Sequence, residues 1–268
     1  MKHLITKTLS IFIFMSLIFL VNACSSEETK SENSLETNQV LKQQKQNTFE
    51  AWQSANLSTL FSKFKDQSFS YTFSKEGFKQ NLANDQLKHF RFYLGVKNNQ
   101  LEITVYGLTA DEMKLPNPQK GKITLNSTKF ENYKNISTLN FAAKLKKVTN
   151  KSAKKHILAL SSAVDYIVAW ENALKDLSTL ESKVSYDAIR IRSFTIHKEA
   201  IEFLVNKNQS SNIELFLGLN KEFKMTTVFL ESGNLDNKLS KQTNRTYALD
   251  LTTPCPNMCD KKMDDLYN

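Results

Sequence analysis

An internal duplication constrains the fold of this chain more than any other feature of its sequence. When the numbering is shifted by 123, residues 71–78 align with residues 194–201, and residues 90–96 align with residues 213–219. Without a gap, eight of the 36 positions from 71 to 106 are identical in the two copies, and nine more exchange one apolar residue for another. The sequence therefore predicts two similar structural units.

The composition is that of a globular protein, and it argues against a phosphate-binding loop. With six glycines and four prolines, the chain contains neither the G-x-G-x-x-G nor the G-x-x-x-x-G-K motif that cradles phosphates. The formal charge of +9 is spread over many lysines, which favours solubility or weak attraction to anionic surfaces. We expect no catalytic residue, no cofactor and no metal ion.

Residues 1–23 are predicted to be a lipoprotein signal peptide. Lys2 and Lys7 precede an apolar run over residues 9–21, which is shorter than the roughly 20 helical residues that span a bilayer. Residues 21–24, Val-Asn-Ala-Cys, resemble the lipobox of bacterial lipoproteins. The resemblance implies cleavage before Cys24 and attachment of palmitate-type acyl chains to it; an ordinary cleaved signal with an incidental cysteine is the alternative.

Residues 24–37 are predicted to be a disordered tether, because they contain almost no apolar residue to bury. A serine, Ser25, follows the cysteine directly, and this resembles the arrangement in lipoproteins sent to the outer membrane. Glu27 and Glu28 resemble the export signal of surface lipoproteins in Bacteroidetes-type bacteria. These resemblances imply an outer-membrane location, with the outward-facing and periplasmic orientations both open.

The predicted fold class is α+β, with two tandem repeats over residues 38–130 and 152–252. Each repeat has a long helix followed by a strand, a short helix and an antiparallel hairpin, because helical spacing gives way to alternation with a period of two. In the first repeat the ranges are 38–66, 68–73, a helix capped by Ser74, 89–97, 100–107 and a further strand over 122–126. In the second repeat they are 152–180, 189–196, 198–206, 212–219, 223–230 and a final strand near 246–251.

Three sets of residues carry specific expectations within the repeats. Trp52 and Trp170 occupy matching helices, and we expect Trp52 in the core before we expect it to stack on a ligand. Asn98 and Asn99 suit a two-residue hairpin turn. Gly95 and Gly218 share one strand position, which indicates close approach by a neighbour, more readily a packed helix than a ligand.

A Lys-rich connector is predicted over residues 131–151 and continues into the next helix. Six lysines and no acidic residue lie between Lys144 and Lys155. A solvated connector is one interpretation, and contact with a polyanion such as the phosphates of lipopolysaccharide is the other. We expect no nucleic-acid partner, because the predicted compartment lies outside the cytoplasm.

The C-terminal tail, residues 253–268, contains Cys255 and Cys259. In an oxidising compartment these two cysteines are expected to form a structural disulfide. The alternatives are a redox dithiol, free thiols, or a metal site that would need His89, His156 or His197. No spacing in the sequence draws these histidines together.

Taken together, these features resemble a family of uncharacterised Bacteroidetes outer-membrane lipoproteins. The resemblance rests on residues 21–24, 213–219, Thr227 with Val228, and the C-P-x-x-C motif within residues 254–259. It implies no activity, and the first repeat lacks the C-P-x-x-C motif.

Three functions follow as hypotheses. The first is a non-catalytic binding or assembly module, anchored to the membrane through Cys24 and contacting an envelope protein. The second is binding of an anionic glycolipid through the region from Lys144 to Lys155. The third is an envelope enzyme using the pairs Lys75–Glu76 and Lys198–Glu199, although first-turn positions in helices explain both pairs equally well.

Overall fold

A computed structural model of the chain describes residues 48–126, 129–133, 148–207, 210–231, 248–249 and 253–255. All of these residues belong to one compact unit, which runs from Thr48 to Asn268. The predicted signal peptide, tether and acylated Cys24 lie outside the described residues. So do most of the connector and the tail beyond Cys255.

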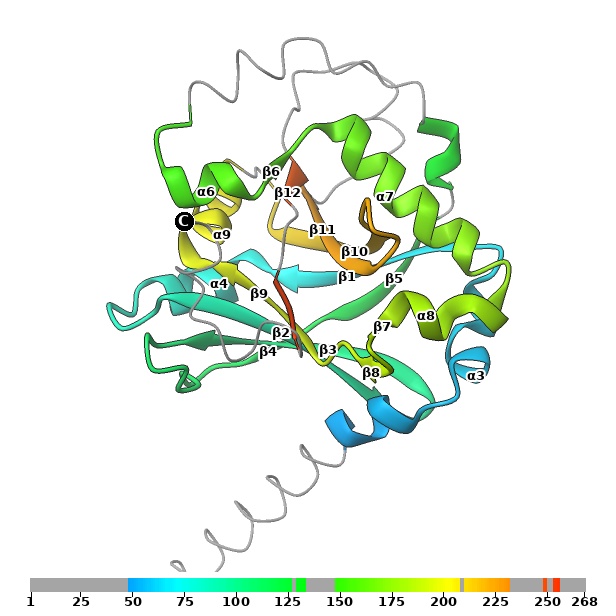
Figure 1. Cartoon of the computed structure of the whole chain (residues 1–268). Helices are drawn as coiled ribbons and strands as arrows, with labels where there is room; N and C mark the ends of the chain where they lie inside the picture. The colour runs from blue at the N-terminus through cyan, green and yellow to red at the C-terminus, as the bar shows by residue number, and fades with distance from the viewer. Residues whose placement is uncertain are drawn as a thin grey trace, which may run out of the picture. The chain divides into compact units, whose positions relative to one another are not determined.

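The described unit is a mixed α/β structure with antiparallel sheets (Figure 1). A six-stranded sheet has the order β5-β1-β10-β11-β12-β6, and a five-stranded sheet has the order β13-β9-β2-β3-β4. The strands of the first sheet are β5 (Lys122–Asn126), β1 (Ser68–Ser74), β10 (Asn212–Leu219), β11 (Met225–Glu231), β12 (Ala248–Leu249) and β6 (Ile157–Leu158). Those of the second are β13 (Thr253–Cys255), β9 (Ser193–His197), β2 (His89–Lys97), β3 (Gln100–Leu108) and β4 (Gln119–Lys120).

Both sheets combine strands from the two predicted repeats. β1 pairs with β10 of the second hairpin, while β9 pairs with β2 of the first hairpin. The registers correspond: Tyr71 lies opposite Leu215, and Phe92 lies opposite Phe194, which are the same positions after the shift of 123. The two hairpins thus lie in different sheets, and each sheet is completed by a strand from the other half of the chain.

The aromatic side chains of the two sheets pack against each other and form the main core. Phe92 of β2 contacts Phe73 of β1 at 5.7 Å between ring centroids and Phe229 of β11 at 5.1 Å, both edge to face. All three rings are buried. The alternation that predicted half-buried strands supplies these inward-facing rings, because successive side chains of a strand point to opposite faces.

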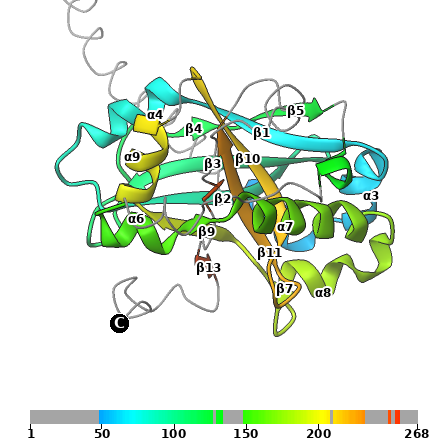
Figure 2. The same cartoon turned by 90° about the horizontal axis from the view of Figure 1, so that it is seen from above.

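Each sheet carries a helix on its other face, as Figure 2 shows for α7 (Leu160–Ala173) over β10 and β11. A Cβ added at Gly218 would lie 3.1 Å from the Cβ of Tyr166 in α7. A Cβ added at Gly95 would lie 2.8 Å from Thr48, in the helical residues 48–54. The expectation that a packed helix approaches both glycines is confirmed.

We expect Gly218→Val to lower the free energy of unfolding by about 1–3 kcal/mol, because α7 backbone as well as side-chain atoms crowd the site. Urea unfolding followed by circular dichroism measures the change. Gly77→Ala is the control, since the atoms nearest its new methyl group belong to the flexible end of Gln119. An unchanged urea midpoint for Gly218→Val would contradict the close packing of α7.

Local predictions in the first half are largely confirmed. β1, β2, β3 and β5 form where expected, and the Ser74 side chain accepts a hydrogen bond from Gly77 N at the start of α4 (Lys75–Leu82). Asn98 and Asn99 have φ angles of 52° and 53° and form the two-residue turn. In the second half, α9 (Lys198–Lys207) and β10 also form as predicted.

The long predicted helices are wrong, because both are divided. In the first half the helical residues 48–54 stop before Asn56, whose side chain caps α3 (Leu57–Phe61); a 3-10 turn, η1 (Ser62–Phe64), follows. In the second half α6 (Lys151–Lys155) gives way to β6, because Ile157 and Leu158 pair with β12. After α7, Asp176 caps a new turn, η3 (Leu177–Thr179), and α8 (Leu180–Val184) follows.

The ungapped alignment of the two halves is also wrong beyond the hairpin turn. Gly95 lies opposite Glu102, and Gly218 lies opposite Thr226, although the shift of 123 would place residue 225 there. Four residues separate the paired Val96 and Leu101 in the first hairpin, whereas five residues, 220–224, separate the paired Leu219 and Met225 in the second. The second hairpin is therefore one residue longer. Thr104 and Thr227 are therefore not equivalent in the pairing.

Candidate functional site

Two turns lie side by side at one end of the unit and form a surface that we call the joined tips, residues 182–190 and 220–224. One is the turn between β7 (Ser185–Tyr186) and β8 (Ile189–Arg190), where Asp187 and Ala188 have positive φ angles. The other is the turn between β10 and β11. Figure 2 shows the two turns together beside the label of β7.

Lys224 joins the two turns. Its Nζ donates hydrogen bonds to the carbonyl oxygens of Ser182 at 2.7 Å and Ser185 at 2.8 Å. The same ammonium group lies 5.2 Å from the centroid of the Tyr186 ring. Burial raises the pKa of Tyr186, so this phenol stays neutral at physiological pH.

The turn between β10 and β11 holds Phe223 in a left-handed conformation with a φ angle of 56°. The Asn220 side chain accepts hydrogen bonds from the backbone N–H groups of Glu222 and Lys224, both at 3.0 Å. Left-handed backbone is unfavourable for a bulky residue, and here the side-chain bonds of Asn220 impose it. As a result, Phe223 projects away from the core with 63% of its surface exposed.

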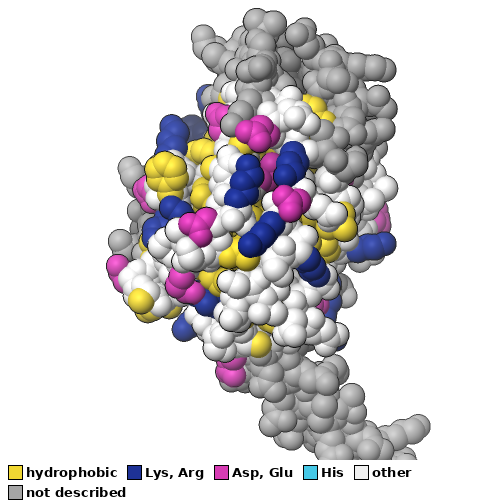
Figure 3. Space-filling view, turned by 90° about the vertical axis from the view of Figure 1, so that its right-hand side faces the viewer, with side chains coloured by type: hydrophobic (Ala, Val, Ile, Leu, Met, Phe, Trp, Pro, Cys, Tyr) yellow, Lys and Arg dark blue, Asp and Glu magenta, His cyan; other side chains and the backbone are white. Residues whose placement is uncertain are grey.

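The joined tips combine exposed apolar and basic side chains. Ile189 is 46% exposed and lies opposite Tyr186 in the small hairpin. Lys183 Nζ lies 5.4 Å from the centroid of the Phe223 ring. Lys221, two residues before Phe223 in the turn, is exposed. Figure 3 views the unit from the side on which α8 lies, where hydrophobic side chains are visible among basic and acidic ones. Exposed apolar side chains beside basic ones make the joined tips a candidate interaction surface.

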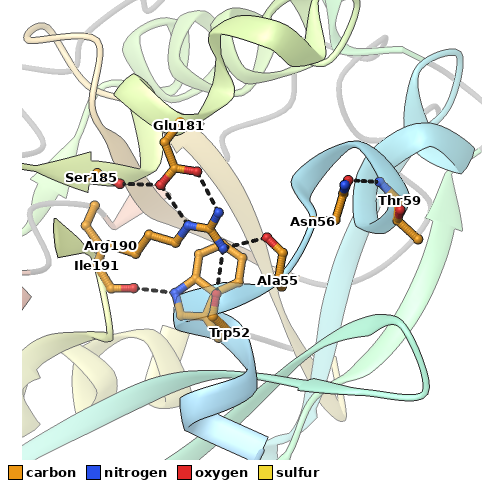
Figure 4. A network of polar contacts seen from close by, with 8 residues as sticks. All are labelled: Trp52, Ala55, Asn56, Thr59, Glu181, Ser185, Arg190 and Ile191. Carbon is orange, nitrogen blue, oxygen red and sulfur yellow. Dashed lines mark hydrogen bonds and ion pairs between the residues drawn. The ribbon is translucent and has the colours of Figure 1, made fainter. Parts of the chain in front are cut away.

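Within the joined tips, the buried side chain of Arg190 bonds to neighbouring elements and holds the small hairpin in place (Figure 4). Arg190 Nη1 donates hydrogen bonds to the carbonyl oxygens of Trp52 at 2.7 Å and Ala55 at 2.8 Å. Its Nε and Nη2 donate to the Glu181 carboxylate at 2.8 and 2.5 Å. The hydrogen bonds from Arg190 hold the pKa of Glu181 below its usual range. This network ties the end of the helical residues 48–54 to α8 and β8.

The structure brings three histidines together, contrary to the sequence expectation. His156 Nε2 lies 2.9 Å from His197 Nδ1, and both side chains are buried. His89 lies opposite His197 in the pairing of β2 with β9, with 5.3 Å between the ring centroids. Sequence spacing missed this cluster because His89 reaches His197 through the pairing of β2 with β9, and His156 meets His197 only through tertiary packing. Among the described residues, no group of three or more His, Cys, Asp or Glu side chains is arranged to hold a metal ion.

A lysine lies among three aromatic rings on the outer face of the five-stranded sheet. Lys114 Nζ lies 4.1 Å from the Tyr93 ring centroid, 4.6 Å from that of Tyr106 and 5.7 Å from that of Phe49. These contacts stabilise the loop between β3 and β4 through cation–π attraction. An open hollow of about 370 Å³ lies near the turn between β2 and β3, with Lys97, Leu101 and Glu102 in its lining.

The cysteines and the first-turn glutamates are the remaining predicted residues. Cys255 lies in β13 opposite Ser193, and Cys259 lies outside the described residues, so their disulfide stays a prediction. Glu76 and Glu199 stand in the first turns of α4 and α9, as expected. Glu76 is exposed and lies 3.7 Å from Lys79 Nζ. Neither carboxylate lines the hollow beside the β2–β3 turn.

Comparison with known proteins adds no relative: no family model, no curated protein and no solved structure matches the chain. Within the described ranges, no helix is both long enough and apolar enough to cross a membrane.

Proposed function

We propose that this protein is a lipid-anchored lipoprotein of the cell envelope, attached to the outer membrane, and that its folded unit is a non-catalytic binding or assembly module. The lipobox-like residues 21–24 support the anchor at Cys24. The observation that carries the binding role is the pair of exposed apolar side chains, Ile189 and Phe223, at the joined tips.

We further propose that the two halves arose by duplication of one unit. The equal registers of β1 with β10 and of β9 with β2 support this, because unrelated segments would have no reason to pair at equivalent positions. The two glycines approached by helices support it as well. A duplicated unit that exchanges strands gives one body with two similar halves.

The joined tips are where the two halves differ, which supports a function there. Two residues, Asn98 and Asn99, turn the first hairpin, whereas residues 220–224 turn the second. Leu60 precedes Ser68 by eight positions, whereas Leu180 precedes Ile191, the counterpart of Ser68, by eleven. The added residues form the turn between β7 and β8.

The anchor is tested by mass spectrometry of the protein purified from the membrane fraction of a Gram-negative host. We expect the chain to begin at Cys24 and to carry acyl groups. Cys24→Ser is expected to abolish acylation and to leave the signal peptide attached. A wild-type protein that is cleaved elsewhere, or that carries no lipid, would contradict the anchor.

The binding role is tested by capture of partners from solubilised outer membranes. We expect wild-type protein to retain an envelope component that Phe223→Ser loses, and the exposed control Met113→Ser to retain it. A module that consistently captures nothing, and that contacts no lipid through the joined tips, would contradict the role.

Polyanion binding is the second candidate, favoured by the exposed Lys151, Lys154 and Lys155 of α6. Binding through these lysines would weaken as salt is added, because ionic strength screens exposed charges. Titration with lipopolysaccharide at low and high salt measures this. Binding that does not respond to salt would remove this candidate.

A further inference from the structure

We propose that the joined tips contact the surface of an anionic lipid bilayer, with Phe223 and Ile189 inserted among the lipid head groups and the flanking lysines on the phosphates. The proposal rests on the lipid anchor proposed above, since the anchor holds the unit close to a bilayer.

Backbone geometry is the first argument for a membrane contact. The residues at the turn could satisfy their hydrogen bonds with a polar side chain at position 223, yet a large aromatic ring is held there in a left-handed conformation. Its neighbours in the turn, Lys221 and Glu222, are polar and exposed. An aromatic ring exposed at the apex of a turn is placed to enter the interface between head groups and acyl chains, where aromatic side chains are favoured.

Charge is the second argument, and it selects an anionic surface. The joined tips contain four basic and two acidic side chains. Arg190 pairs with Glu181, which lies just outside the tips, so three basic groups, Lys183, Lys221 and Lys224, remain beside two acidic ones. Lys183 lies over the Phe223 ring, so its ammonium group reaches the phosphate level when the ring inserts. Each lysine near an anionic membrane contributes a modest attraction.

Tethering is the third argument, because two apolar side chains alone bind a bilayer weakly. A chain held by acyl groups at Cys24 meets the membrane as an intramolecular event, so a weak second contact is enough to orient the unit. A protein partner at the joined tips would show the opposite behaviour: the tips would stay in water until that partner is added.

The experiment uses full-length acylated protein in vesicles of phosphatidylcholine and phosphatidylglycerol, with bromine atoms on the acyl chains of part of the lipid. Phe223→Trp adds a fluorophore at the apex, while Trp52 and Trp170 are buried and give the background. We expect the brominated lipid to remove most of the added emission, and the emission maximum to shift to shorter wavelength. Vesicles of phosphatidylcholine alone should quench much less.

Two comparisons separate insertion from mere proximity. Leu125→Trp places the same fluorophore at a residue that is 56% exposed on β5, outside the joined tips, and we expect little quenching. Combining Lys183→Gln and Lys221→Gln with Phe223→Trp should lose most of the quenching in anionic vesicles.

Flotation and mass spectrometry accompany every measurement. Acylated protein that floats with the vesicles but shows no quenching at position 223 would overturn the membrane contact and leave the anchor intact. Equal quenching at positions 125 and 223 would overturn it too. A protein without acyl groups on Cys24 would overturn both the anchor and the inference that rests on it.

Discussion

Trp52→Ala is expected to lower the free energy of unfolding by about 3–5 kcal/mol, a large part of the stability of a domain of this size. Trp52 is fully buried, and its Nε1 donates a 2.6 Å hydrogen bond to the carbonyl oxygen of Ile191. Truncation leaves a cavity and removes this bond between the two halves. Urea unfolding followed by circular dichroism gives the change.

Trp170 provides the matched comparison. It is equally buried in α7 and packs edge to face on Phe61 at 5.5 Å, but its Nε1 has no hydrogen-bond partner in the part of the chain that the structure describes. Trp52→Phe should therefore cost about 1 kcal/mol more than Trp170→Phe, the typical value of one hydrogen bond. The two phenylalanine variants remain informative even if Trp52→Ala does not fold. Equal losses in the two variants would contradict the role of the Ile191 bond.

Arg190→Met is expected to lower the free energy of unfolding by about 2–3 kcal/mol. The substitution leaves the carbonyl oxygens of Trp52 and Ala55 without their donor at the end of a helix. Arg190→Lys should recover little of this loss, because an ammonium group cannot reproduce the fork of the guanidinium. A lysine variant as stable as wild type would show that charge alone, and not this geometry, matters.

The same network predicts a dependence on pH. Because Arg190 holds the pKa of Glu181 below its ordinary value of 4.5, the pair stabilises the fold above that value. This contribution is lost as pH falls through the lowered pKa, where the carboxylate takes up a proton. Arg190→Met should lack this part of the loss of stability in acid. The contribution of the Arg190–Glu181 pair to stability is small, because the Glu181 side chain is 54% exposed. Thermal unfolding of both proteins between neutral and acidic pH checks it.

Local patterns in the sequence predict elements well where neighbouring residues provide the reason. Ser74 caps its helix, Asn98 and Asn99 turn their hairpin, and the alternation over residues 68–73 forms a strand. Periodicity fails where an apolar run has another use. Ile157 has helical spacing with the residues that follow it, but pairing with Leu249 of β12 draws it into a strand.

In the candidate site, too, some features follow from local sequence and others depend on the tertiary structure. The sequence predicts Phe223 as the first residue of a strand over residues 223–230. The Asn220 side chain places this ring in a turn, and a pattern with a period of two does not report such capping. The sequence did not predict the histidine cluster, because His89 and His197 meet only through the pairing of strands from different halves.

By itself, the sequence predicted a strand, a short helix and a hairpin in each half of the chain, because residues close together in the chain decide these elements. The tertiary structure alone decided that strands from the two halves of the chain pair with each other, and that two separate turns meet at Lys224. These arrangements depend on which buried faces fit against each other, and that choice is made by packing across the whole unit.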